Sequence, residues 1–281
     1  MPNGFLIINK QAGMTSHDVV NKIRKQLQTK QVGHTGTLDP NATGVLIVAI
    51  GKATKAISYL ENDDKVYEAE LTLGLTTDTE DIWGNVIEEK EVNVSNNQIE
   101  EVIKSFVGNI KQVPPMYSAL KVNGKKLYEL ARDGITVERV ARDITIFDIF
   151  DIKINNNRVR FTVHCSKGTY IRTLCKDIGE KLGCGACMSS LNRIKVGNFD
   201  ILDSVLIENV DNSSLIELQE PLKKYNEIYL EGENAKKYKN GVKILVTNED
   251  GLYRIYLDNV FYGIGKVEKG ILKSEKCLVL I

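Results

Sequence analysis

Residues 33–44 constrain this chain more than any other stretch, and they read Gly-His-Thr-Gly-Thr-Leu-Asp-Pro-Asn-Ala-Thr-Gly. The segment holds three glycines, a proline and one carboxylate, Asp39, and it runs into the apolar stretch 45–50. Because glycine and proline interrupt regular backbone, we expect a constrained loop here rather than a helix or a regular strand. Such a loop fixes Asp39 in place. From composition alone, the simplest interpretation is a turn in which Asp39 caps the backbone that follows.

Apolar periodicity predicts the elements along the rest of the chain. An Asn123-Gly124 pair indicates a tight hairpin, and Thr15 or Ser16 is placed to cap the first helix. The predicted strands are 5–9, 45–50, 65–73, 144–154, 158–165 and 188–196, and the predicted helices are 17–28, 53–60, 96–107, 126–132 and 170–181. A regular strand–helix repeat is missing from this order. We therefore expect an α+β fold, with a mixed, largely antiparallel central sheet and flanking helices.

Length and turn composition predict two domains. The 281 residues, 42% of them apolar, suffice for one large domain and one small one. Beyond a boundary near residues 221–227, short apolar runs alternate with Asn-Gly, Asp-Gly and Lys-Gly turns. We predict a large domain over 1–225 and a small β-rich domain over 226–281.

Charge is balanced overall but unevenly distributed. The chain has 37 basic and 37 acidic residues, a balance that is unusual for a nucleic-acid-binding protein. Residues 1–60 carry a net charge of +5, residues 61–110 carry −10, and residues 111–200 carry +7. A polyanion could bind a surface built from the two basic segments, although ordinary variation in surface charge is an equally good explanation.

The cysteines and the N-terminus favour a reducing, cytoplasmic location. Five cysteines form no dense framework, no signal peptide opens the chain, and no apolar run has membrane-spanning length. The pair Cys184 and Cys187 has the CxxC spacing of a redox or zinc site, but no second pair or nearby histidine accompanies it. We expect these thiols to pack in the interior, and we expect no metal site and no cofactor.

Several segments together resemble the TruB family of pseudouridine synthases. The Asp39 segment GHTGTLDPNATGVL is similar to the family's nucleophile loop. Further similar blocks follow in family order: NKQAGMTSHDVV (9–20), GKATKAISYLENDDKVYEAELTLGLTTDTED (51–81), VPPMYSALKVNGKKLYELAR (113–132), CSKGTYIRTLCKDIG (165–179) and SSLNRIKVGNF (189–199). The C-terminal module resembles the family's small RNA-binding, PUA-like domain by its position.

The resemblance implies a pseudouridine synthase fold and an isomerisation without cofactor. The N-glycosidic bond of a uridine is cut, the uracil turns, and its C5 is joined to C1′ of the ribose. The implied substrate is uridine 55 in the T-loop of tRNA, in the T-arm, and we expect the enzyme to be a monomer. Recognition of a structured loop by shape suits an enzyme that must extrude its target base.

The resemblance also assigns the catalytic residues. Asp39 would be the nucleophile, because a carboxylate can form a covalent intermediate that divides one difficult step into easier ones. Arg172, in the stretch GTYIRTL, would keep that carboxylate charged in a dry site. Tyr67 would stack on the uracil and help to move the C5 proton, although a tyrosine in a strand is more often simply packed in the core.

The remaining assignments concern binding. Tyr170 would contact the base or its neighbour, and Leu191 would form a wall of the pocket. His34 would lie against the RNA near the extruded nucleotide, and Lys10 and Lys55 would meet phosphates. His17 and His164 are given no role.

Three other functions are compatible with parts of the sequence. A non-catalytic RNA-binding or tRNA-folding protein could use the same fold, but it would not need Asp39, Tyr67 and Arg172 together. The guide-RNA-dependent branch of the superfamily is a second alternative, although this chain lacks basic tails. A redox enzyme based on the CxxC pair is the third.

Overall fold

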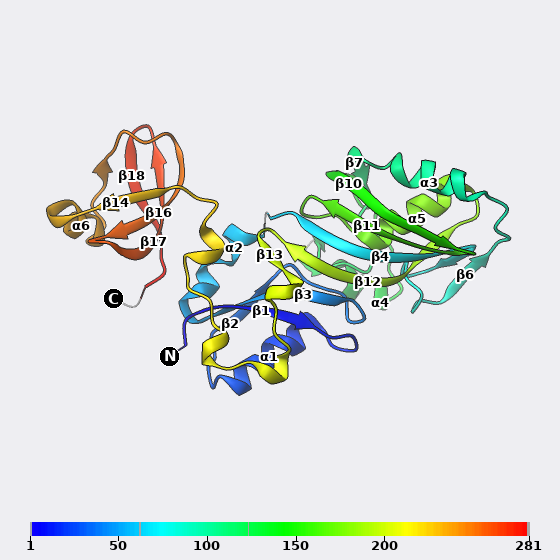
Figure 1. Cartoon of the computed structure of the whole chain (residues 1–281), viewed down its shortest axis with the longest axis horizontal. Coiled ribbons are helices and arrows are strands. Elements are labelled where there is room, and N and C mark those ends of the chain that lie inside the picture. The colour runs from blue at the N-terminus through cyan, green and yellow to red at the C-terminus, as the bar shows by residue number, and fades with distance from the viewer. Residues whose placement is uncertain (1, 62, 123, 280–281) are drawn as a thin grey trace. The chain divides into compact units, whose positions relative to one another are not determined.

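The computed structural model describes residues 2–61, 63–122 and 124–279, and the chain divides into two compact units (Figure 1). The first unit comprises residues 1–40, 44–62 and 198–281, and the second comprises residues 41–43 and 63–197. Asn123, the first residue of the predicted hairpin turn, lies outside the described residues. The strands that flank it pair as expected, Lys121 with Lys126 and Val122 with Lys125.

The first unit is built on β3 (Thr43–Ile50), which pairs antiparallel with both β1 (Gly4–Lys10) and β2 (Val32–Thr35). The side chains from Val45 to Ile50 are completely buried, so this apolar stretch is a core strand. Helical segments complete this part of the unit: α1 (Ser16–Gln26), η1 (Gly51–Ala56), α2 (Ile57–Leu60), η2 (Ile201–Asp203), η3 (Ile207–Asn209), η4 (Asn212–Ser214) and η5 (Glu220–Leu222).

Strand β2 corrects one expectation about the glycine-rich segment. Residues 33–44 were expected to contain no regular strand, yet residues 33–35 belong to β2. The reason is tertiary: β3 supplies the hydrogen bonds, and Gly33 permits a close approach by α2. A Cβ at Gly33 would lie 2.7 Å from Cδ1 of Ile57. Glycine within a strand often marks such an approach.

The predicted first helix is confirmed as α1. Thr15 caps it by accepting a hydrogen bond from the backbone of Asp18, whose side chain bonds back to Thr15. The buried stripe includes Val19, Val20 and Ile23. By contrast, the predicted helix over 53–60 begins as the 3-10 helix η1. There the side-chain hydroxyl of Thr54 also donates to the carbonyl of Gly51, at 2.7 Å.

The second unit is an antiparallel sheet covered on one face by helices. Its strands lie in the order β12-β4-β11-β10-β7, and α5 packs against β12 and β4 while α3 packs against α5 (Figure 1). Its elements are β4 (Lys65–Leu73), β5 (Leu75–Thr77), β6 (Val86–Glu89), α3 (Asn96–Lys104), β7 (Gly108–Gln112), β8 (Lys121–Val122), β9 (Lys125–Lys126), α4 (Leu127–Arg132), β10 (Arg142–Asn155), β11 (Arg158–Cys165), α5 (Ile171–Leu182) and β12 (Ala186–Val196).

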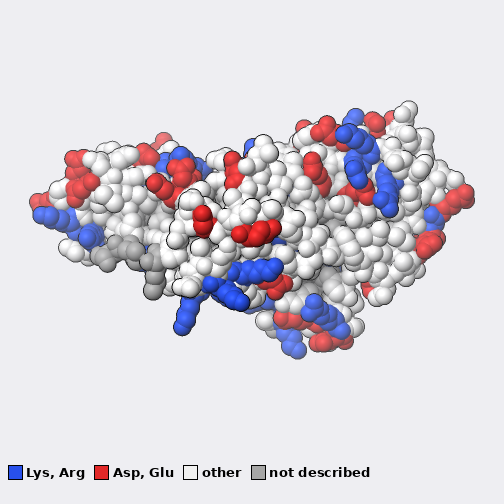
Figure 2. All heavy atoms as spheres, turned by 60° about the horizontal axis from the view of Figure 1, so that its bottom comes forward, with Lys and Arg blue, Asp and Glu red and all other residues white. Residues whose placement is uncertain are grey.

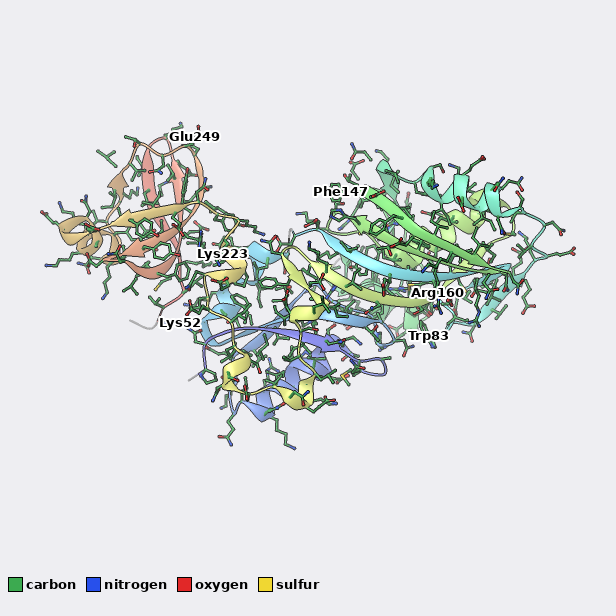
Figure 3. All side chains as sticks on the ribbon, in the orientation of Figure 1. Lys52, Trp83, Phe147, Arg160, Lys223 and Glu249 are labelled. Atoms are coloured by element: carbon green, nitrogen blue, oxygen red, sulfur yellow. The ribbon has the colours of Figure 1, made fainter. Side chains whose placement is uncertain are left out.

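Alternation along the strands gives this sheet two different faces. Ala69, Phe161 and Val163 are buried on the face toward α5. The opposite face carries Glu70, which accepts a hydrogen bond from Nε of Arg160 at 2.5 Å (Arg160 is labelled in Figure 3). Burial acts to raise the pKa of Glu70, but the hydrogen bonds from Arg160 and Ser189 outweigh it and hold that pKa below its usual range.

The C-terminal residues form the β-rich module that the sequence predicts. Its sheet has the order β14-β16-β17-β18-β15, with β14 parallel to β16 and the other pairs antiparallel. The strands are β14 (Glu227–Leu230), β15 (Ile244–Leu245), β16 (Gly251–Leu257), β17 (Val260–Glu268) and β18 (Ile271–Cys277). The helix α6 (Gly232–Lys239) was not predicted, because Ala235 and Tyr238 are its only buried residues. The domain boundary after residue 225 stays a prediction.

The five cysteines are unpaired, and all except Cys277 are buried. Burial raises the pKa of the Cys187 thiol to about 11 and that of Cys165 to about 12. Cys184 and Cys187 are both buried, so the CxxC pair packs in the interior as expected. Within residues 2–61, 63–122 and 124–279, no cluster of three or more histidine, cysteine or carboxylate side chains is arranged to hold a metal. Helices in the same ranges are too short or too polar to cross a bilayer.

Replacing Gly179 with alanine tests how tightly α5 packs on the sheet. A Cβ at Gly179 would lie 2.1 Å from the backbone nitrogen of Ala186 and 2.3 Å from the carbonyl carbon of Gly185. Alanine favours a helix by about 1 kcal/mol over glycine, but overpacking against backbone costs about 1–3 kcal/mol or more. We expect Gly179→Ala to lower the free energy of unfolding in urea. Glu180→Ala, at an exposed neighbour, should change it by less than about 0.5 kcal/mol. Equal stability of the two variants would contradict the contact.

The half-buried carboxyl of Asp177, also on α5, should make the free energy of unfolding depend on pH. Burial raises the pKa of its carboxyl from 3.8 to about 6, with Lys176 opposing and Glu180 and Glu80 adding to the rise. A folded-state pKa above the unfolded value means that this group favours folding at low pH, and that this contribution is lost as the pH rises toward 6. Asp177→Asn removes the effect. Urea unfolding between pH 4 and pH 7 should therefore show the variant gaining stability relative to the parent as pH rises. A constant difference would refute the assignment.

Candidate active site

The backbone on the N-terminal side of Asp39 is fixed by Ser16. The hydroxyl of Ser16, the first residue of α1, donates to the carbonyl of Leu38 at 3.1 Å and accepts from the amide of Leu38 at 2.9 Å. Both Ser16 and Leu38 are buried. One side chain therefore satisfies both polar groups of the residue that precedes Asp39, and no regular strand or helix is needed there.

The backbone on the C-terminal side of Asp39 is fixed by Lys10. Its ammonium donates to the carbonyls of Gln11 at 3.0 Å, Met14 at 2.7 Å and Pro40 at 3.0 Å. The amide of Gly13 also donates to Pro40, at 3.1 Å. The Asp39 side chain itself is half-buried, on a loop held at both neighbouring residues.

Lys10 requires a correction. The sequence predicted that it meets a phosphate of the RNA, but its side chain is completely buried and surrounded by carbonyl acceptors. An ammonium enclosed in this way is not accessible to a phosphate in this conformation. Its hydrogen bonds instead hold the Asp39 loop against the end of β1.

His34 and Lys55 lie in the same unit as Asp39. His34 is in β2, opposite Val48 of β3, and is half-buried. Lys55 is in η1 and is exposed to solvent, so its ammonium is accessible to an anion. Their predicted contacts with RNA stay predictions.

Tyr67 and Leu191 share the buried face of the sheet in the second unit. Tyr67, in β4, is 8% exposed and lies opposite Arg193 of β12. Leu191 is 7% exposed and lies opposite Ala69, two residues along β4 from Tyr67. Residues two apart on a strand point to the same face, so the structure brings these predicted pocket residues together.

Tyr170 and Arg172 stand at the start of α5, which packs on this sheet. Tyr170 is the N-cap, and both of its backbone groups bond to the side-chain amide of Gln112, at 2.8 and 3.0 Å. This pairing fixes the point at which the helix begins. Because α5 packs against β12 and β4, its first turn is anchored relative to the sheet that carries Tyr67 and Leu191.

The guanidinium of Arg172 is buried and held by carbonyl groups. Nη1 donates to Thr79 at 3.1 Å, and Nη2 donates to Tyr117 at 2.7 Å. Nη1 also lies 4.0 Å from the carboxylate of Asp81, which itself accepts from the hydroxyl of Thr79 at 2.7 Å. The exposed Trp83, labelled in Figure 3, follows in the same turn and donates its amide to Asp81. The planar fork of Arg172 therefore has a fixed orientation.

Sequence reasoning missed four residues of this region. Ser16 fixes the backbone of Leu38, and Asp81 lies beside the guanidinium of Arg172. Lys65 and Arg193 are buried cations beside Tyr67. Burial, aided by the charge of Arg193, lowers the pKa of Lys65 to about 8. For Arg193 a signal existed, because its spacing from Leu191 places both on one face of a predicted strand. Ser16 offers no such signal, since a serine near a helix start is expected to cap it.

Two protein-family models match consecutive parts of the chain. Residues 24–171 match the N-terminal domain of the TruB family pseudouridylate synthases. Residues 172–231 match the tRNA pseudouridylate synthase B C-terminal domain. The first match covers more than half of the sequence, including the Asp39 loop.

Full-length relatives agree with this assignment. The tRNA pseudouridine synthase B of Clostridium kluyveri is 49% identical, over 99% of this chain and 100% of the relative. That of Clostridium perfringens strain 13 is 47% identical, over 99% of both chains.

Solved structures give the same fold. A crystal structure of a Cbf5–Nop10–Gar1 complex contains a chain that is 25% identical, with a TM-score of 0.74 over 99% of this chain and 85% of that one. A structure of an H/ACA RNP bound to a substrate RNA containing 2′-deoxyuridine has a TM-score of 0.74 at 22% identity, over 99% of this chain and 86% of that one. The expected α+β architecture is confirmed. This chain belongs to the TruB family and is a pseudouridine synthase.

Proposed function

We propose that this enzyme converts uridine 55 in the T-loop of tRNA to pseudouridine, with Asp39 as the nucleophile. The curated relatives, which are matched over their whole lengths, are named for action on tRNA, and this supports the substrate class. The assignment of Asp39 as the nucleophile is supported by the hydrogen bonds that fix the backbone of Leu38 and Pro40 on either side of it. A carboxylate on so constrained a backbone is positioned before the substrate arrives, which lowers the entropic part of the barrier.

The chemistry requires a carboxylate that remains charged when water leaves the site. We assign this task to Arg172, because its fork is already oriented by the carbonyls of Thr79 and Tyr117. Asp81, 4.0 Å away, offsets part of the arginine's charge before RNA binds. Asp39 attacks the uridine to form a covalent intermediate, the bond between N1 and C1′ breaks, and the uracil turns and bonds to C1′ through C5. The bond to Asp39 is then broken, C5 loses its proton and N1 gains one.

The base and its surroundings would be held by the remaining predicted residues. Tyr67 supplies an aromatic face for the uracil, and Leu191 closes the pocket on the same side of the sheet. Tyr170 contacts the base or its neighbour. His34 lies against the RNA, and Lys55, whose ammonium is exposed, binds a phosphate.

Three further assignments belong to this proposal. Residues 226–281 act as an RNA-binding, PUA-like domain. The enzyme works as a monomer on the T-arm of its tRNA. It works in the cytoplasm, where the five unpaired thiols would stay reduced.

A tritium-release assay tests the reaction and the nucleophile. An unmodified tRNA transcript labelled at C5 of its uridines should release the label from one uridine, because C5 becomes the glycosidic carbon. Asp39→Asn should abolish release while leaving tRNA binding largely intact, since the change is nearly isosteric. Asp143→Asn is a matched control, because its carboxylate is 88% exposed and lies 4.0 Å from Lys111. Turnover by Asp39→Asn near the parent rate would exclude Asp39 as the nucleophile.

Ser16→Ala tests whether the fixed backbone matters for catalysis. The variant leaves the amide and carbonyl of Leu38 without their partner, so Asp39 should shift. A displacement of about 1 Å can lower the rate about 10²-fold. We expect kcat to fall by about 10–100-fold while KM for tRNA changes little.

Thr15→Ala provides the control for Ser16→Ala. It also removes one hydroxyl from the start of α1, but that hydroxyl caps the helix and does not contact Leu38. Loss of such a cap costs about 1 kcal/mol of stability. We therefore expect Thr15→Ala to unfold at lower temperature with an unchanged kcat. If both variants lose kcat equally, general destabilisation explains the loss and the fixation of Leu38 does not.

A further inference from the structure

A basic hollow lies at the C-terminal end of α1, on the first unit. It has a volume of about 600 Å³ and is lined by Asn21, Arg24, Lys25, Gln28, Thr29 and Lys30. Of these six described residues, three are cations and none is acidic. Figure 2, which turns the α1 side of this unit toward the viewer, shows lysine and arginine side chains gathered there with some acidic residues beside them.

The helix and its final turn bring these side chains together. Asn21, Lys25 and Gln28 are spaced four and three residues apart, so they lie along one face of α1 and its continuation. The backbone of Gln28 is left-handed, with φ of +48°, and the amide of Thr29 donates to the carbonyl of Arg24 at 3.1 Å. This turn reverses the chain and carries Lys30 back to the hollow.

Gln28 occupies a position that favours glycine. A left-handed conformation costs a residue with a side chain about 1 kcal/mol. A glycine would make the same turn with less strain. At this place the side chain of Gln28 adds an amide donor to the rim of a basic hollow.

Arg24 is held in a fixed orientation within the hollow. Nη1 donates to the side chain of Asn21 at 3.1 Å, and Nη2 donates to the carbonyl of Val32 at 3.0 Å. Its Nε donor is buried and has no acceptor among the described residues. An unsatisfied buried donor costs about 1–3 kcal/mol. The Nε group of Arg24 is thus a donor for which the fold supplies no acceptor among the described residues.

Stabilisation of helix α1 does not account for all three cations of the hollow. Cations in the last turn of a helix interact favourably with its dipole, and this explains Arg24 and Lys25. It does not explain Lys30, four residues beyond the end of α1, because the effect is confined to the last turn. Glu208, in the neighbouring η3, is not among the residues that line the hollow.

We propose that this hollow binds phosphate groups of the tRNA backbone, at a place separate from the pocket for the extruded uridine. The inference rests on the proposed function, because it takes tRNA as the polyanion. Lys25 and Lys30 are exposed and form no ion pair among the described residues, so they can bind phosphates without first losing a partner. Asn21, Gln28 and Thr29 add neutral donors of the kind that commonly contact phosphate oxygens.

The salt dependence of tRNA binding tests this proposal. Each lysine–phosphate contact releases counterions and adds about 0.7–0.9 to the slope of log Kd against log salt concentration. We expect Lys25→Ala/Lys30→Ala to weaken binding of an unmodified tRNA transcript and to lower this slope by about 1.5. In tritium release, the loss should appear mainly in KM.

A second double variant separates a local effect from a change in net charge. Lys90→Ala/Lys104→Ala removes the same charge, but these lysines already pair with Glu88 and Glu100 in the acidic segment. We expect this variant to keep the parent's slope. Lys25→Arg/Lys30→Arg should also keep it, because the charges remain. Circular dichroism would check that each variant is folded.

Two results would overturn the proposal. One is a parental slope and Kd in Lys25→Ala/Lys30→Ala. The other is an equal decrease in slope in the Lys90→Ala/Lys104→Ala control, which would mean that overall charge, and not the hollow, governs binding. Either result leaves the proposed reaction intact if the parent enzyme still releases tritium. Failure of the parent to release tritium would instead contradict the proposed function itself.

Discussion

The buried ammonium of Lys10 is the interaction on which the Asp39 loop depends. Placing a charge in the interior is strongly unfavourable unless hydrogen bonds compensate for the lost water. Here three carbonyls do so, and one of them belongs to Pro40. Proline has no amide hydrogen, so its carbonyl is the one backbone group through which residue 40 can be held. The buried Lys10 therefore holds a loop whose backbone is not held by the hydrogen bonds of a regular strand.

The second unit buries two cations on the face of the sheet that carries Tyr67. Arg193 is 1% exposed and lies directly opposite Tyr67, and Lys65 lies two residues before Tyr67 on the same strand. Burial and the nearby Arg193 lower the pKa of Lys65 to about 8, so near neutral pH most of the Lys65 side chains still carry a proton. Both cations lie where water is largely excluded, so their electrostatic interactions with neighbouring groups are stronger than they would be in water.

Local patterns in the sequence predicted most elements but not the contacts between them. The capping box at Thr15 and the alternation along 65–73 depend on neighbouring residues, and the structure confirms both. Strand β2 was missed because glycine usually breaks a strand, whereas here Gly33 serves a close approach of Ile57. Lys10 was assigned to a phosphate because it lies in a segment that resembles the family, and its true acceptor Pro40, thirty residues away, is linked to it by no periodicity. Contacts of this kind become visible only when the chain is folded.

Helix α1 joins the two features of the first unit that we propose to act on RNA. At its N-terminal end Ser16 holds Leu38, beside Asp39, and near its C-terminal end Arg24 donates to Val32, where β2 begins. Its 11 residues span about 16 Å, so it braces the whole segment from β2 to the Asp39 loop. Because α1 is anchored by hydrogen bonds near both ends, a phosphate bound at its C-terminal end leaves the contact between Ser16 and Leu38 in place. The basic hollow can therefore contribute to affinity while the position of Asp39 is preserved.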